Sequence, residues 1–300
     1  MQEVYPKTII ACIEYVEKKF TDSRLFFGHG TTNAHEEASW LVMSVTELEE
    51  ITLEIEQTFV VQLPQYLSIE KLAELRIMTR KPLAYLLGES WFSGHKFYID
   101  ERVIVPRSHI GEHIRDRFHP WLGIMPIQSA LDLCTGSGCI AVAMALAFCD
   151  ITVDAVDISV EALDVARKNI ERYSLDKRVR LFQGDLFDAL TPLSSYDLIV
   201  CNPPYVSTQI IQDLPPEYRF EPAVAFDGGA DGLDIVCRIL RECSKHLTNS
   251  GRLFMELGSA AMELEEKSPK TPFTWLTSSN GESAVLTLTK QELIKIQERF

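Results

Sequence analysis

A glycine-containing turn between a buried strand and an apolar helix is the feature that most restricts the fold of this chain. Ser129 to Cys134 has the composition of a strand, the turn Thr135-Gly136-Ser137-Gly138-Cys139 follows, and Ile140 to Phe148 is an apolar helical stretch. This order opens nucleotide-type α/β folds, because glycines let the backbone approach a ligand closely. Taken alone, the Gly-x-Gly pair indicates only a tight turn, since Ala141 stands in place of the third glycine of the dinucleotide fingerprint.

A second predicted strand, Val153 to Val156, ends in Asp157. Adenosine-binding folds have an acidic residue roughly 20 positions after the glycine turn, where it accepts hydrogen bonds from the ribose hydroxyls. Asp157 lies close to this spacing. The alternative is an ordinary aspartate that caps the helix starting near Ser159. Binding of a phosphate has less support, because no lysine follows the glycines.

The tetrapeptide Asn202-Pro203-Pro204-Tyr205 directly follows the apolar run 196–201. Two prolines exclude both ladder pairing and an immediate helix, so Asn202 is held at a strand end, where open α/β sheets place ligands. There the Asn202 amide and the Pro203 carbonyl would accept both hydrogens of a planar NH2 group and aim its nitrogen at an electrophile, with Tyr205 against its flat face. On the tetrapeptide alone, a turn with an aromatic plug is an equally good interpretation.

These three signals, in this chain order, resemble the Rossmann-like S-adenosylmethionine-dependent methyltransferases, in their amino-methylating branch. The resemblance implies S-adenosyl-L-methionine as cofactor, with the glycine turn beside its methionine part, Asp157 on its ribose and Asp185 beside its adenine. The cofactor residues implied in this way are Asp132, Thr135, Gly136, Ser137, Gly138, Asp157, Asp185 and Leu186. The substrate residues are Asn202, Pro203, Pro204 and Tyr205, of which Asn202, Pro203 and Tyr205 are the catalytic candidates.

The rest of the carboxy-terminal part alternates between strand and helix patterns. Further strands are predicted at 178–182 and 251–257, a helix at 231–246, and a closing pair at 273–276 and 284–288 with a turn at Asn280-Gly281. Alternation of this kind gives a parallel sheet, and the closing pair suggests an antiparallel strand at or near its edge. The fold class is therefore α/β, with the seven-stranded, mostly parallel sheet that the resemblance implies.

A chain of 300 residues exceeds one typical domain. We expect a helical substrate-recognition domain at 1–90, a β-hairpin linker at 91–107 and the methyltransferase domain at 108–300. The hairpin strands are predicted at Lys96 to Ile99 and Val103 to Val105. Three apolar stripes at helical spacing predict the helices of the first domain: Ile9, Ile10, Ile13, Val16 and Phe20; Ala38, Leu41, Val42 and Val45; and Leu72, Leu75, Ile77 and Met78.

The formal net charge is −14, from 43 acidic and 29 basic residues. A free nucleic-acid substrate is disfavoured, because such substrates usually require a basic surface, whereas a basic polypeptide is favoured. The alternative is that the acidic surface only keeps the protein dispersed. Seven cysteines without metal-type pairing predict reduced thiols, no metal and a cytoplasmic location. No membrane attachment is expected, because no apolar run approaches ~18 residues and Met1 to Lys7 lacks a signal-peptide pattern.

A finer resemblance covers nearly the whole chain. A helical amino-terminal domain, a linker ending in Pro-Arg and the Asn-Pro-Pro-Tyr motif are similar to the protein glutamine N(5)-methyltransferases. The branch that acts on ribosomal protein L-3 is resembled most closely, through the segments 27–34, 97–102, 106–108 and 134–139. His109 departs from the proline usual in that branch, and Leu186 replaces the tryptophan often present in the branch acting on peptide-chain release factors.

The resemblance implies direct methyl transfer to a glutamine side-chain nitrogen of ribosomal protein L-3, free or in an assembling large subunit. The protonated amide would lose its proton to water, so no general base is needed. Three alternatives remain: a release-factor glutamine methyltransferase, an adenine-specific nucleic-acid methyltransferase, and a cofactor-binding module without activity.

Overall fold

The computed structural model describes residues 5–123, 126–279, 281 and 283–300. The chain forms two compact units. The first, here called the helical unit, runs to Ser90 and includes Pro215–Phe220; the second, here called the sheet unit, comprises Trp91–Leu214 and Glu221–Phe300. The first four residues and Asn280 of the predicted turn lie outside the described residues.

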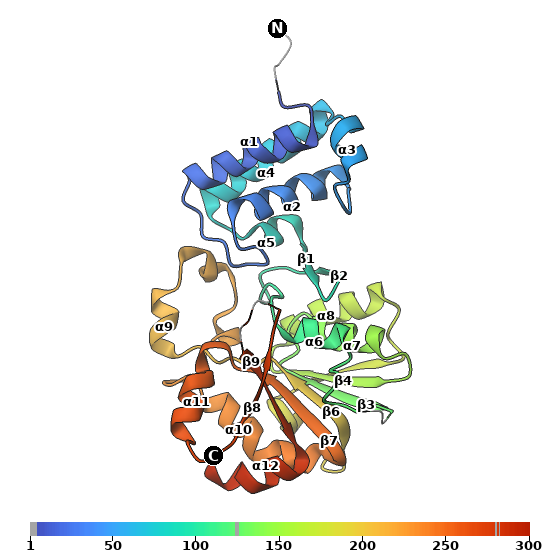
Figure 1. Ribbon diagram of the computed structural model, residues 1–300, viewed down its shortest axis with the longest axis vertical. Helices are drawn as coiled ribbons and strands as arrows, with labels where there is room; N and C mark the ends of the chain where they lie inside the picture. Colours follow the sequence, from blue (N-terminus) through green and yellow to red (C-terminus); the bar gives the residue numbers. More distant parts are fainter. Residues whose placement is uncertain (1–4, 124–125, 280, 282) are drawn as a thin grey trace. The chain divides into compact units, whose positions relative to one another are not determined.

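The sheet unit is built on a seven-stranded sheet in the order β5-β4-β3-β6-β7-β9-β8 (Figure 1). Pairing is parallel from β5 to β7, and β9 is antiparallel to both β7 and β8, so the predicted mostly parallel sheet is confirmed. The chain order reverses between β3 and β6, which is where open α/β sheets bind ligands. The strands are β3 Ser129–Leu133, β4 Thr152–Asp157, β5 Val179–Gln183, β6 Tyr196–Cys201, β7 Leu247–Glu256, β8 Thr274–Thr277 and β9 Ser283–Thr289.

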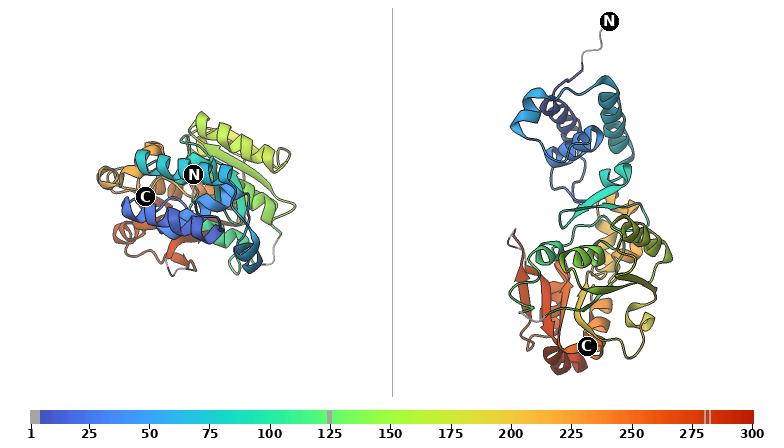
Figure 2. Two further views of the ribbon diagram at one scale, coloured as in Figure 1. Left: turned by 90° about the horizontal axis from the view of Figure 1, so that it is seen from above. Right: turned by 90° about the vertical axis from the view of Figure 1, so that its right-hand side faces the viewer.

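Helices cover both faces of this sheet (Figure 2). Neighbouring strand residues point to opposite faces, so Ala130 packs in a core cluster with α6 and α7, and Leu131 packs in a second cluster with α10 and α12. Burial on both faces explains why the strands are continuous apolar runs. The α-helices of this unit are α6 Ile110–Arg115, α7 Cys139–Ala147, α8 Val160–Arg172, α9 Thr208–Asp213, α10 Asp234–Glu242, α11 Ala261–Lys267 and α12 Lys290–Ile296. Short 3-10 helices lie at Leu186–Ala189, Ala223–Ala225, Cys243–His246, Gly258–Ala260 and Gln297–Arg299.

The β-hairpin is present, and one of its two strands is the predicted one: β2 overlaps the predicted strand at 96–99, whereas the other strand is different. β1 Glu89–Phe92 pairs with β2 His95–Tyr98, and the predicted partner Val103–Val105 is not a strand. Ser93 and Gly94 both have positive φ, 51° and 81°, as a two-residue hairpin turn requires. Val103 is buried by packing, and its N–H donates to the Asp100 carbonyl in a turn. Val103 and Val105 are buried and Ile104 is partly exposed, so this apolar run packs against the unit without forming the predicted strand.

The helical unit contains α1 Ile9–Asp22, α2 Ala34–Thr46, α3 Leu53–Thr58, α4 Leu63–Thr79 and α5 Leu83–Leu87, with the 3-10 turn Pro216–Phe220. The first two predicted stripes pack as expected, apart from Ile10, which is 36% exposed, and Val45, which is only partly buried. The third stripe predicts the helix correctly but its buried face only in part, because Leu72 and Ile77 pack against the core and the other two residues do not. Met78 is 81% and Leu75 39% exposed, whereas α4 buries Ile69, Ala73 and Arg76.

Arg76 is buried because it is paired on several sides. Its Nε donates to Glu37 Oε1 at 2.6 Å, and its Nη1 lies 3.8 Å from Glu217 Oε1. Glu217, from the inserted segment Pro215–Phe220, also pairs with Arg80 at 2.6 Å and accepts a hydrogen bond from the Phe26 N–H at 2.9 Å. Buried charges are tolerated only when compensated in this way. This ion cluster therefore anchors the inserted segment within the helical unit.

Within the described part of the chain, none of the helices is both long and apolar enough to span a bilayer.

Candidate active site

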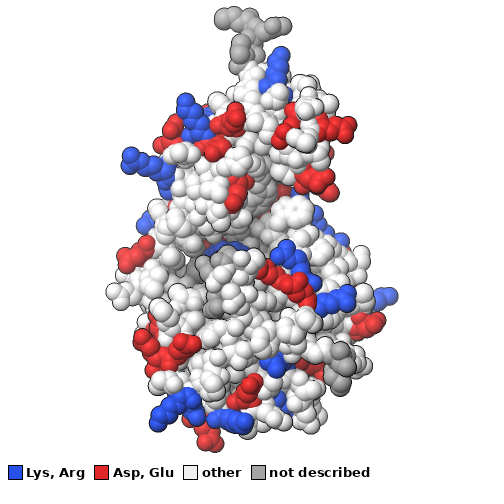
Figure 3. Space-filling view, viewed as in Figure 1, with Lys and Arg blue, Asp and Glu red and all other residues white. Residues whose placement is uncertain are grey.

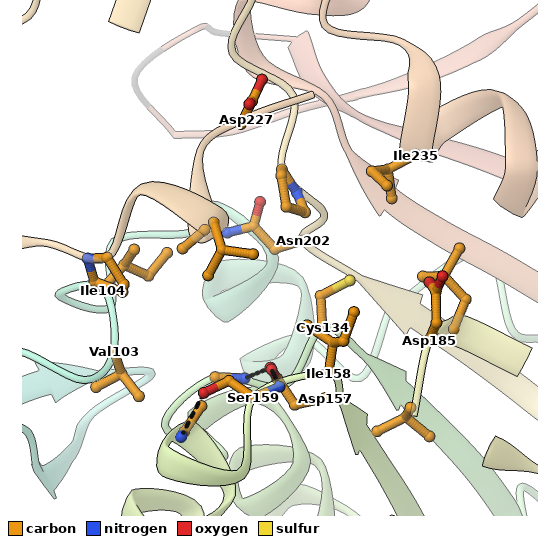
Figure 4. Close-up of a pocket in the computed structure, with 18 of the residues that line it drawn as sticks. Val103, Ile104, Cys134, Asp157, Ile158, Ser159, Asp185, Asn202, Asp227 and Ile235 are labelled. Atoms are coloured by element: carbon orange, nitrogen blue, oxygen red, sulfur yellow. Dashed lines mark hydrogen bonds between the residues drawn. The ribbon is translucent and has the colours of Figure 1, made fainter. Parts of the chain in front are cut away.

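A pocket opens at the carboxyl ends of β3, β4 and β6, beside the point where the strand order reverses (Figure 4). Of the residues predicted from sequence, it is lined by Gly136, Asp157, Asp185, Leu186, Asn202 and Pro204. The other lining residues are Arg102, Val103, Ile104, Cys134, Val156, Ile158, Ser159, Ala162, Gly184, Pro222, Val224, Ala225, Asp227 and Ile235. The structure therefore brings the three motifs of the sequence to one cavity.

The glycine turn is supported from behind by Asp132, at the end of β3. Asp132 is fully buried, and its Oδ2 accepts hydrogen bonds from Thr135 Oγ1 at 2.5 Å and from the Ala141 N–H at 3.0 Å. Gly138 has φ +76°, and an added Cβ would lie 3.0 Å from Ala166 Cβ. Together with Ser137, these residues are outside the pocket lining. Their position indicates that they shape the loop that Gly136 presents to the cavity.

Burial raises the pKa of Asp132 to about 7, against the two hydrogen bonds that it accepts. Below about pH 4 the carboxyl is protonated in both the folded and unfolded states. Between about pH 4 and 7 the unfolded state ionises first, so this group's contribution to stability is lost as the pH rises. We expect up to about 4 kcal/mol of pH-dependent stability from this group. The free energy of unfolding, measured with urea, should fall less between pH 4.5 and pH 7.5 for Asp132→Asn than for the wild type.

Equal pH slopes in the two proteins would mean that Asp132 is ionised in the folded state throughout.

Asp157 lies at the end of β4 with its carboxylate in the pocket. Its Oδ2 accepts from the Gly136 N–H at 2.8 Å and its Oδ1 from the Ser159 N–H at 2.9 Å, both drawn in Figure 4. Burial raises its pKa. The side-chain cap of α8 is Ser159, which accepts from the Ala162 N–H, so Asp157 is not the side-chain cap of that helix. Each oxygen keeps a second lone pair that can accept a ligand hydroxyl.

Asp185 and Leu186 form another part of the pocket, after β5. Asp185 Oδ2 lies 2.9 Å from Arg238 Nη2 of α10, and Leu186 is buried with φ +52°. A positive φ is unusual for a branched apolar residue and occurs mainly where the surroundings determine it. It turns the chain directly after Asp185, so both residues lie on the cavity wall.

Asn202 follows β6 and is part of the pocket lining (Figure 4). No described residue donates a hydrogen bond to its Oδ1, although this atom is almost completely buried. Leaving a buried acceptor unpaired costs about 1–3 kcal/mol, unless a ligand supplies the donor. Asn202 Oδ1 is therefore an acceptor that a ligand N–H group could satisfy.

Pro203 and Tyr205 are not part of the pocket lining. Tyr205 packs closely against Gly258, where an added Cβ would lie 2.7 Å from its ring, and an added Cβ on Gly232 would lie 2.4 Å from its carbonyl oxygen. Gly258 and Gly232 both have positive φ, so neither position favours a side chain. Tyr205 is consequently fixed by its ring on one side and by its carbonyl on the other.

The wall formed by residues 102–104 and 222–227 was missed in the sequence. Val103 and Ile104 have a strand-like composition, and residues 222–227 carry no motif. Arg102 is held by Asp100 through two hydrogen bonds of 2.8 and 2.6 Å, and this guanidinium lowers the pKa of Asp100 to about 2. In the described residues, no His, Cys, Asp and Glu side chains are grouped so as to hold a metal ion.

Comparisons with known proteins identify the fold and the family of the chain. The sequence profile of the Methyltransferase small domain family matches residues 122–214. The catalytic domain of hMettl16, solved in complex with the MAT2A 3'UTR hairpin 6, superposes with a TM-score of 0.50 at 17% identity, covering 83% of this chain and 90% of that one. At this identity the similarity shows the Rossmann-like methyltransferase fold alone.

Two curated relatives are much closer. The ribosomal protein uL3 glutamine methyltransferase of Neisseria meningitidis serogroup A is 42% identical over 96% of this chain and 94% of its own length. The protein of the same name from Francisella tularensis is 42% identical over 98% of this chain and 93% of its own length. The chain is therefore a methyltransferase and belongs to the family of ribosomal protein uL3 glutamine methyltransferases.

Proposed function

We propose that this protein transfers a methyl group from S-adenosyl-L-methionine to the side-chain amide nitrogen of a glutamine in ribosomal protein uL3 (L-3). The observation that carries the proposal is the buried, unpaired Oδ1 of Asn202, in the same pocket as Gly136 and Asp157. The names of the relatives supply the substrate.

The pocket fits the methyl donor. An added Cβ on Gly136 would meet nothing within 4 Å, so a ligand can lie directly against the backbone there. Asp157 would accept the ribose hydroxyls, while Asp185 and Leu186 would lie beside the adenine. When bound, the donor supplies an electrophilic methyl group on a sulfonium.

Asn202 and its neighbours would orient the nucleophile. Asn202 Oδ1 and the Pro203 carbonyl would accept the two N–H bonds of the glutamine amide, so that its nitrogen points at the methyl group. These acceptors also stabilise the positive charge that develops on nitrogen, and they need no reorganisation during the reaction. The N–C bond would form as the carbon–sulfur bond of the donor breaks, S-adenosylhomocysteine would be the leaving group, and the protonated methylated amide would lose one proton to water. Tyr205 would cover the flat face of the amide and exclude other water molecules.

The net charge of −14 supports a basic polypeptide as substrate. On the face shown in Figure 3, Lys and Arg side chains are scattered among Asp and Glu rather than gathered into one basic area. We assign substrate recognition to the helical domain, residues 1–90, joined by the linker at 91–107 to a catalytic domain at 108–300. The segment Pro215–Phe220 of that catalytic range groups with the helical unit and would serve recognition as well. A uL3 substrate also supports a cytoplasmic location.

Incubation with tritiated S-adenosylmethionine tests the proposal. Free uL3, unmethylated large ribosomal subunits, a peptide-chain release factor and an RNA hairpin would be compared, and the label located by mass spectrometry. We expect label on one glutamine of uL3 and none after that glutamine is changed to glutamate. Label on the release factor or the RNA in place of uL3 would replace the proposed substrate. Binding of S-adenosylhomocysteine without transfer to any acceptor would indicate a module without activity.

A further inference from the structure

One wall of the pocket consists of two segments that are far apart in the sequence. Residues Arg102 to Ile104 belong to the linker, and Pro222 to Asp227 follow the loop after the Asn-Pro-Pro-Tyr motif. Neither segment pairs with a strand of the seven-stranded sheet. The second segment is joined by its backbone to Val206, whose N–H donates to the Phe226 carbonyl at 2.8 Å. Side-chain interactions connect it to the linker.

Glu221 supplies the principal connection. Its Oε1 accepts from Arg107 Nη1 at 2.7 Å and from the Val105 N–H at 2.8 Å, and its Oε2 accepts from Arg107 Nη2 at 3.0 Å. The carboxylate is buried, and Arg107 Nη1 also donates to the Val105 carbonyl at 2.9 Å. The same guanidinium lies 5.7 Å from the ring centroid of Phe226. The Glu221 carboxylate therefore binds the Val105 backbone and the Arg107 side chain, which follow the first segment, while Glu221 itself directly precedes the second segment.

We propose that Glu221 is a positioning residue that holds this wall closed around the methyl donor. The inference rests on the proposed function in one respect, namely that the donor occupies this pocket. Glu221 is outside the pocket lining and does not touch a reacting group. It acts through its neighbours, because Pro222 follows it directly and the linker residue Ile104 precedes Val105, whose N–H it binds. Its bidentate pairing with Arg107 fixes orientation as well as distance.

Glu217 provides a matched control in the same loop. It is also a buried glutamate paired with arginine, but its partners are Arg76 and Arg80 of the helical unit. Neither arginine lines the pocket. A general effect of removing a buried carboxylate should therefore be seen for both glutamates, whereas an effect on the pocket wall should be seen only for Glu221.

The test measures S-adenosylhomocysteine binding by calorimetry in the full chain. Glu221→Gln is expected to raise the Kd at least about tenfold, because charge-assisted hydrogen bonds to the wall are lost. Arg107→Gln should raise the Kd similarly. The Kd of the double variant should not exceed that of the single variant with the higher Kd, because both changes break the same interaction. Glu217→Gln should leave the Kd within about twofold. A wild-type Kd for Glu221→Gln would overturn the inference.

Hydrogen exchange without ligand separates this inference from the proposed function. In Glu221→Gln, the amides of residues 102–107 and 221–227 should exchange faster together, while the Glu217→Gln variant leaves them unchanged. If the wild type failed to bind S-adenosylhomocysteine, the cofactor assignment would fall and this joint opening would still decide the role of Glu221. Unchanged exchange in both segments would contradict that role even if the donor binds.

Discussion

Changing Asn202 to alanine is expected to lower the rate of methyl transfer by about 10²–10³-fold, the usual cost of removing one oriented polar group from a preorganised site. The Oδ1 of Asn202 is buried without a partner, so we expect it to accept a hydrogen bond when a substrate N–H arrives. Single-turnover measurements with uL3 would give the rate. The affinity for S-adenosylhomocysteine, measured separately, should change little, because Asp157 and the glycine turn are untouched.

Asn249→Ala is the matched control for this change. Asn249 is exposed and outside the pocket lining, so both the rate and the affinity should stay at the wild-type level. Near-normal turnover of Asn202→Ala would remove Asn202 from the chemistry. A loss of donor affinity equal to the loss of rate would instead assign it to cofactor binding.

Changing Arg76 to methionine is expected to destabilise the helical unit by about 3–5 kcal/mol, because breaking a buried ion cluster leaves uncompensated charge. Glu37 would lose its 2.6 Å partner, and Glu217 would retain Arg80 as its one arginine partner. Hydrogen exchange localised to α1, α2 and α4 measures the effect, since it reports the opening of this unit separately from the sheet unit. The inserted segment Pro215–Phe220 should lose protection with these helices.

Arg167→Met serves as the control. Arg167 is 2.8 Å from Asp164 on the surface of α8, where both side chains are about half exposed. An exposed pair of this kind contributes only about 0.3–0.5 kcal/mol, so exchange should scarcely change anywhere. Equal effects of the two substitutions would show that the buried cluster contributes no more to stability than a surface pair.

Much of the fold and part of the site could be predicted because the signals are local. A strand buried on both faces is a short apolar run, two glycines permit the positive φ values at Gly136 and Gly138, and two prolines stop β6 at Asn202. Strand ends of a parallel sheet meet at one edge. The order of the motifs along the chain was therefore enough to bring Gly136, Asp157 and Asn202 into one pocket.

The wrong predictions concern strand pairing and side-chain pairing, in which the partner is chosen by the tertiary structure. Val103–Val105 is as apolar as a strand, but the positive φ values of Ser93 and Gly94 select the shorter hairpin between β1 and β2. The buried face of α4 includes Arg76, which hydrophobic periodicity counts as an exposed position. Its burial becomes favourable only because Glu37 and Glu217 arrive from elsewhere in the chain.

The amino-acid sequence by itself determined the α/β class, the strand-end placement of the motifs and, through resemblance, the family of the chain. Tertiary structure alone decided that Asp132 supports the glycine turn from behind, that residues 222–227 meet residues 102–104 at the pocket, and that Glu221 joins them. The physical reason is the range of the interactions. Backbone preferences and periodic burial act within a few residues, whereas the pairing of a buried charge depends on which distant segment comes within hydrogen-bond distance.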